Sequence, residues 1–115
     1  MSRADAERID DIIEAASEIA AIVDAGREAW ENDHVRQLAV ERLLEIIGES
    51  ARAMTDAGRA RYPGIPWSDV IGLRTVLAHH YHRVDPDQVW TFATKDVPAL
   101  LDRLGSGRSR DDEVS

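Results

Sequence analysis

The stretch Ile9-Asp-Asp-Ile-Ile-Glu-Ala-Ala-Ser-Glu-Ile-Ala-Ala-Ile-Val23 determines the fold class of this chain. Its apolar side chains recur every three or four residues with acids between them, a spacing that gives an α-helix one apolar face. We expect Ser2 to cap the start of this helix and Gly26 to end it. A helix with one apolar face must pack against other elements, so the rest of the chain should supply them.

Three more segments have helical periodicity, and the sequence shows no strand pattern and no internal repeat. Two prolines and two glycines interrupt the chain before the third helix. Ser68 is the expected cap of that third helix, and Asp85 followed by Pro86 is the expected start of the fourth. The predicted helices cover about 32–57, 68 to 81–83 and 86–104, with a loop over 58–67.

The predicted architecture is an all-α, up-and-down bundle of four to five helices over residues 1–104. Pro98 lacks a backbone N–H, so we expect a kink or a break in the last helix at that point. Residues 105–115 are polar and are expected to form a disordered tail.

Composition and charge exclude several classes of protein. The chain of 115 residues has no cysteine, which rules out disulfides, a thiolate zinc site and a cysteine nucleophile. The longest apolar run is too short to span a bilayer, and the beginning of the chain does not resemble a secretory signal, so a cytoplasmic protein is expected. The net charge of −8 argues against a protein that coats nucleic acid. The acidic excess lies in residues 1–57, while 58–104 are nearly neutral.

Candidate chemistry is concentrated in the run Leu77-Ala-His79-His-Tyr81-His82, in which His79 lies five residues after Arg74. A histidine near its ordinary pKa can move a proton at neutral pH, and a guanidinium can stabilise charge on phosphoryl oxygens. This pair suits phosphodiester cleavage, and RNA supplies its own 2′-hydroxyl nucleophile. No metal or other cofactor is therefore expected.

Helix geometry restricts how Arg74 and His79 can cooperate. Residues five apart diverge by roughly 140° around a straight helix, whereas Arg74 and Tyr81 share a face. A working pair therefore needs either a bend at the end of the helix or a second copy of the chain that completes the site.

The segment Arg74-Thr-Val-Leu-Ala-His79-His-Tyr81 resembles the R-x4-H-x-Y motif of HepT-like toxins in the HEPN superfamily. The lead-in Tyr62-Pro-Gly-Ile-Pro-Trp67 and the segment Ile46-Ile-Gly-Glu49-Ser-Ala51 are similar to the same family. The resemblance covers roughly residues 8–104. It implies a HEPN-type bundle that forms a homodimer and acts as a metal-independent endoribonuclease toxin in a composite cleft.

The resemblance also assigns roles to single residues. It implies that Arg74 and His79 are catalytic, and that a cognate nucleotidyltransferase antitoxin binds the toxin and adenylylates Tyr81. Thr75 stands where the family commonly has asparagine and could support the site through its hydroxyl. His80 also fits the looser Arg-to-His spacing of the family, but only His79 keeps the H-x-Y register.

Other interpretations of the same residues remain open. The chain could be a non-catalytic helical subunit that binds nucleotide or serves a nucleotidyltransferase. The histidine run could hold a metal, but its spacing suits tetrahedral coordination poorly. Trp67 and Trp90 are expected to pack rather than stack on bases. Glu49 is expected to pair with a buried arginine. Arg59 and Arg61 are candidate phosphate contacts.

Overall fold

The computed structural model describes the backbone of residues 2–79 and 85–114, and the side chains of residues 2–75, 77 and 85–105. None of these residues lies in a strand, which confirms the predicted all-α class. No helix in the described ranges is both long and apolar enough to cross a bilayer. The elements are α1 (Arg3–Val23), α2 (Arg27–Glu31), α3 (His34–Ala53), α4 (Asp56–Ala60), α5 (Trp67–His79), α6 (Pro86–Thr91), the π-helix η1 (Phe92–Asp96) and α7 (Val97–Val114).

Side-chain caps fix the starts of three helices where the sequence predicts them. Ser2, Asp33 and Asp85 each accept a hydrogen bond from a backbone N–H two or three residues further on. Such a bond satisfies one of the donors that have no partner in the first turn of a helix. Gly26 lies between α1 and α2 with a φ of +96°, which glycine adopts without strain.

Two short helices, α2 and α4, are absent from the sequence prediction. The helix predicted to continue to residue 57 ends at Ala53, because Met54 is extended and Thr55 starts α4. The Thr55 hydroxyl accepts the N–H of Gly58 at 3.0 Å. The buried Asp5 side chain accepts hydrogen bonds from the hydroxyl and the backbone N–H of Thr55 at 2.5 and 2.9 Å. A contact fifty residues away along the chain therefore decides where α3 stops.

The beginning of α5 also differs from the prediction. The carbonyl of Pro66 accepts the N–H of Asp69 at 3.0 Å and that of Val70 at 3.1 Å, so the helix begins at Trp67. Ser68 lies inside the first turn and is not the cap. The predicted end of this helix, near residues 81–83, lies outside the described residues.

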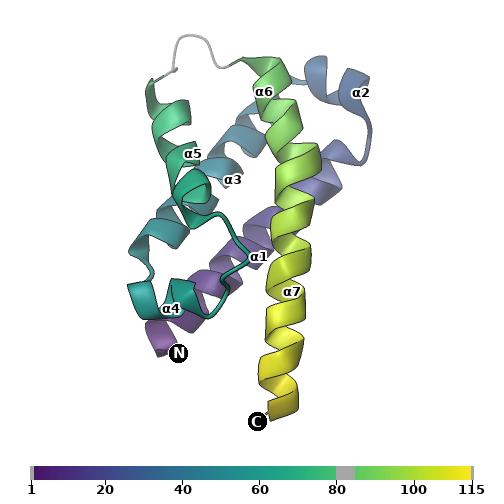
Figure 1. Ribbon diagram of the computed structural model, residues 1–115. Coiled ribbons are helices and arrows are strands. Elements are labelled where there is room, and N and C mark those ends of the chain that lie inside the picture. Colours follow the sequence, from purple (N-terminus) through teal and green to yellow (C-terminus); the bar gives the residue numbers. More distant parts are fainter. Residues whose placement is uncertain (1, 80–84, 115) are drawn as a thin grey trace.

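The last three elements follow one another without a loop, as the long column in Figure 1 shows. Instead of breaking at Pro98, the chain forms the π-helix η1 immediately before it. A π-helix changes the hydrogen-bond register, and here it lies where the proline cannot donate. The backbone remains helical to Val114, through the segment for which the sequence predicts disorder.

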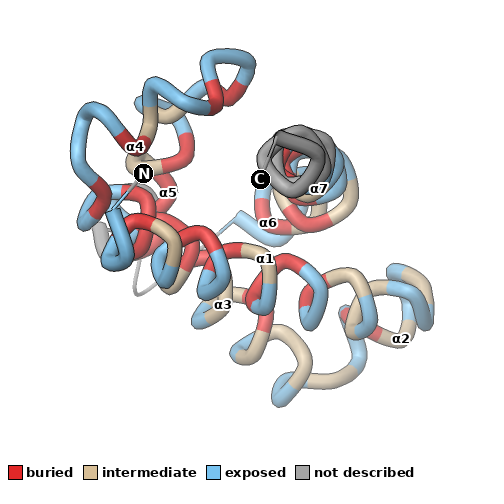
Figure 2. The backbone as a smooth tube through the Cα atoms, turned by 90° about the horizontal axis from the view of Figure 1, so that it is seen from below, coloured by how far each residue is buried: buried red, intermediate tan, exposed pale blue. Residues whose placement is uncertain are grey.

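The helices form two packed layers around one core. The neighbours α1 and α3 run in opposite directions, α5 packs on α3, and α7 crosses α1 (Figure 1). Buried residues line the inner faces of these helices, as the red segments in Figure 2 show. The predicted stripe of the first helix supplies Ile9, Ile12, Ala16 and Ile19 to the core. Trp30 of α2 packs against Trp90 of α6, with ring centroids 5.4 Å apart.

Candidate functional site

The candidate site lies on α5, and Gly48 of α3 fixes the distance between these two helices. A Cβ placed on Gly48 would lie 3.1 Å from both the Cβ and the backbone nitrogen of Arg74, and 3.3 Å from the carbonyl oxygen of Val70. Real Cβ atoms rarely have neighbours that close, so glycine permits an approach that any other residue would oppose. The Gly-Glu segment on α3 thus has a structural role directly beneath the arginine of the motif.

Arg74 and Thr75 are both exposed on the surface of α5. Six other arginines have carboxylate partners within 4.0 Å, but none of the described side chains forms an ion pair with Arg74. A guanidinium carries five N–H donors in a planar fork that suits phosphate oxygens. Within the described part of the chain, Arg74 is therefore a cation available to a ligand.

The remaining residues of the motif are only partly described. His79 is the last residue of α5, and its side chain lies outside the described set; His80 and Tyr81 lie outside the described residues altogether. The backbone from Arg74 to His79 is α-helical without interruption. The divergence of roughly 140° expected between positions five apart on an α-helix therefore applies to this segment.

Glu49 pairs with an exposed arginine, not with the buried arginine that the sequence predicts. Its carboxylate lies 3.5 Å from the guanidinium of Arg42, which is itself exposed and also pairs with Glu45 at 3.0 Å. One turn before Glu45, burial raises the pKa of the Glu41 carboxyl above its ordinary value, and repulsion from Glu45 raises it further. Of the three acids of α3, Glu49 is exposed and Glu41 and Glu45 are partly buried, so none of them is a fully buried partner for an arginine.

Arg59 contacts protein and is not directed towards solvent. Its guanidinium donates to the carbonyl oxygens of Ala51 at 3.0 Å and Met54 at 2.7 Å, at the end of α3. The last carbonyls of a helix have no partner within the helix, so Arg59 caps α3. Its own carbonyl accepts the indole N–H of Trp67 at 2.9 Å. The packing role predicted for the tryptophans is confirmed, and the guanidinium of Arg59, a candidate phosphate contact, donates to the carbonyl oxygens at the end of α3.

Sequence reasoning named Arg74 but missed Gly48 as the residue that determines where it lies. The available signal was an isolated glycine within a helical pattern, which usually has a packing reason. A sequence cannot show which helix comes close to it.

The sequence from residue 12 to residue 106 matches the profile of the family described as ribonuclease HepT-like. The chain therefore belongs to the HepT-like family of the HEPN superfamily. A protein of Thermococcus cleftensis named as a probable ribonuclease HepT is 34% identical over 104 residues, which are 87% of this chain and 92% of that protein. A protein of Methanocaldococcus jannaschii named as a provisional RNase is 34% identical over 91 residues, or 78% and 84% of the two chains. No solved structure gives a significant match.

Proposed function

We propose that this protein is a metal-independent endoribonuclease that acts as the toxin of a toxin–antitoxin pair. The observation that carries the proposal is that Arg74 is exposed and has no ion-pair partner among the described side chains. Arg74 also lies within the segment that matches the ribonuclease family. A buried or paired arginine at this position would have opposed the proposal. Arg74 is exposed, and no side chain in the described part of the chain pairs with it.

In the proposed mechanism His79 accepts the proton of the RNA 2′-hydroxyl, whose oxygen then attacks the adjacent phosphorus. The bond from phosphorus to the 5′-oxygen breaks, and the departing oxygen takes a proton from water, which leaves a 2′,3′-cyclic phosphate and a 5′-hydroxyl; His79 then returns its proton to the solvent. Arg74 stabilises the negative charge that grows on the phosphoryl oxygens. The Thr75 hydroxyl and His80 would support substrate binding next to this pair.

The catalytic pair is proposed to form across a homodimer. Because α5 is regular between Arg74 and His79, the two side chains of one copy start on different faces of the helix. A two-fold axis beside α5 would place the arginine of one copy near the histidine of the other. The exposed Val35 and Leu38 of α3, with 74% and 52% of their surface accessible, offer apolar area for such an interface.

The proposed antitoxin is a nucleotidyltransferase that adenylylates Tyr81 in the cytoplasm. Tyr81 lies seven residues after Arg74 in the sequence, nearly two helical turns. A phosphodiester-linked nucleotide there would add a bulky anion close to the guanidinium, which would compete with the RNA phosphate for Arg74. Replacing Tyr81 with phenylalanine should prevent this modification and keep cleavage.

The decisive test is RNA cleavage by the purified protein in EDTA, with analysis of the ends. Cyclic phosphate ends are expected, and His79→Ala or Arg74→Ala should abolish them. Arg8→Ala removes an exposed arginine that is only weakly paired, at 3.9 Å, so it is the matched control and should keep full activity. Cleavage that survives His79→Ala would refute its role. Binding of ATP or AMP without any cleavage would favour the non-catalytic subunit instead.

Mixing the two inactive variants tests the composite cleft separately. A heterodimer of Arg74→Ala with His79→Ala contains one intact pair if the pair forms between copies, and none if it forms within a copy. Random mixing should then restore roughly a quarter of wild-type activity. No restoration, from subunits shown to exchange, would refute the composite cleft and leave the ribonuclease assignment standing.

A further inference from the structure

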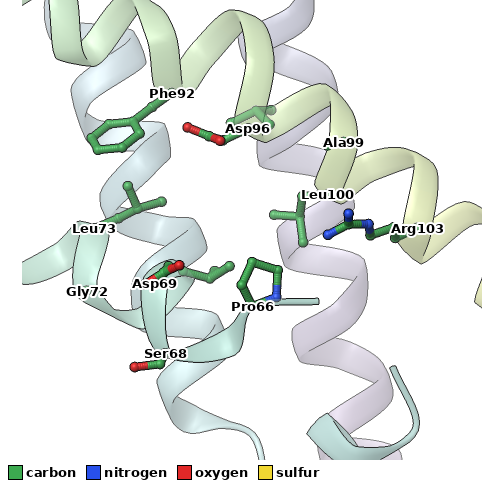
Figure 3. Close-up of a pocket in the computed structure, with 12 residues that line it drawn as sticks. Pro66, Ser68, Asp69, Gly72, Leu73, Phe92, Asp96, Ala99, Leu100 and Arg103 are labelled. Carbon is green, nitrogen blue, oxygen red and sulfur yellow. The ribbon is translucent and has the colours of Figure 1, made fainter. Parts of the chain in front are cut away.

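A cavity of about 490 Å³ opens between α5 and the column formed by η1 and α7. It arises because α5 packs on α3 while α7 packs on α1, which leaves the two facing helices apart. Figure 3 shows Leu73 and Leu100 facing this space from opposite sides, with Pro66 at one end and Phe92 at the other. The size falls within the range of small-molecule pockets, and most of the lining is apolar.

Two carboxylates lie on the wall of this cavity, Asp69 on α5 and Asp96 at the end of η1. Neither makes an ion pair with a described side chain. In Figure 3 the carboxylate of Asp96 points into the cavity. Asp69 has another reason for its position, since an acid in the first turn of a helix interacts favourably with the dipole. Asp96 lies inside the continuous column of α6, η1 and α7, so it does not stand at a free helix N-terminus and has no such role.

The cation on the wall of the cavity is already engaged. The guanidinium of Arg103 donates to the carbonyl oxygen of Gly64 at 2.8 Å, on the loop before α5. Arg103 therefore makes a hydrogen bond to this loop and no ion pair with Asp96. The cavity therefore combines an apolar body with an end at which no described side chain pairs with the carboxylate of Asp96.

We propose that this cavity binds a small organic cation, in which a protonated amine sits on an aromatic or branched aliphatic body. The amine would meet the carboxylate of Asp96, and the apolar body would lie between Leu73, Leu100 and Phe92. A charge-assisted hydrogen bond at an apolar pocket confers preference for a cation over its neutral and anionic analogues. Neither Gly48 nor Arg74 lines this cavity, so the proposal does not rest on the proposed ribonuclease function.

The test compares three probes of nearly equal size: phenylbutylamine, phenylbutanol and phenylbutyrate. An NMR titration of the folded protein follows the amides of Gly72 and Ala99, which lie on opposite walls. We expect saturable shifts with the amine at a Kd on the order of millimolar or tighter, about tenfold weaker binding of the alcohol, and no binding of the carboxylate. Equal binding of all three probes would overturn the assignment of charge.

Two variants locate the site. Asp96→Asn should weaken binding of the amine about tenfold, while Asp102→Asn, on α7 but lining a different groove, makes the same change in net charge and should leave binding unchanged. Ala99→Phe should fill the cavity and abolish binding of the amine without altering any charge. Equal affinities in the two asparagine variants, or unaltered binding in a folded Ala99→Phe protein, would refute the proposal.

Discussion

Replacing Gly48 with alanine should destabilise the protein, although the same change usually stabilises a helix. An alanine in a helix interior is more favourable than glycine by about 1 kcal/mol. At Gly48 the new methyl group would lie 3.1 Å from two atoms of Arg74 and 3.3 Å from a carbonyl oxygen. Two of those three contacts are with backbone, which cannot rotate away, so α5 must move. Overpacking of this kind costs about 1–3 kcal/mol.

Gly72 provides the matched control because it is also a glycine within a helix, and a Cβ added to it would meet nothing within 4 Å. Gly72→Ala should therefore gain about 1 kcal/mol. Urea unfolding followed by circular dichroism measures both variants under one set of conditions. The free energies of unfolding of the two variants should differ by about 1–3 kcal/mol, with Gly48→Ala the less stable.

The same pair of variants tests whether the helix spacing affects Arg74. A shift of α5 by a few tenths of an ångström moves the Cα of Arg74 with it, and catalytic groups tolerate such displacement poorly. RNA cleavage should thus fall several-fold in Gly48→Ala and stay unchanged in Gly72→Ala. If both alanine variants are equally stabilised, the close approach of α3 and α5 is refuted, whatever the activity does.

Three other predictions concern stability. Hydrogen bonds from the hydroxyl and backbone N–H of Thr55 lower the pKa of Asp5. This carboxylate therefore stabilises the fold above about pH 4, and its contribution is lost as the pH falls through the lowered pKa. In urea unfolding, the free energy of unfolding should fall less between pH 7 and pH 2 in Asp5→Asn than in the wild type. Glu41 has the opposite sign, because its raised pKa favours the protonated side chain in the folded state. Glu41→Gln should raise the melting temperature at pH 7 and leave it unchanged at pH 3, and an equal rise at both would contradict this reasoning. Trp67→Phe removes an indole donor with two carbonyl acceptors and should cost about 1–3 kcal/mol in urea unfolding, whereas no loss would show that these hydrogen bonds are dispensable.

The parts of the fold that the sequence predicts correctly depend on interactions between near neighbours. Ser2, Asp33 and Asp85 cap their helices through bonds to residues two or three positions away, so the local pattern is sufficient. The apolar stripe from Ile9 to Ile19 is buried because its period matches the helix.

The parts that the sequence misses depend on distant contacts. A five-residue helix has less than two turns of periodicity, so α2 and α4 leave almost no signal. Trp30 anchors α2 through Trp90, and Thr55 starts α4 against Asp5. At the candidate site, the motif identifies Arg74, but the role of Gly48 depends on which helix lies across from it.

The bond between the indole of Trp67 and the carbonyl of Arg59 has a consequence for the rotational phase of α5. Trp67 is the first residue of that helix, and Arg74 follows seven positions later, within about 20° of the same azimuth. Fixing the indole thus fixes the direction in which the arginine leaves the helix. Insertions in the loop before Trp67 lengthen the connection without turning α5. One residue inserted between Trp67 and Arg74 would rotate the guanidinium by about 100°, so the chain tolerates length changes on one side of this tryptophan and not on the other.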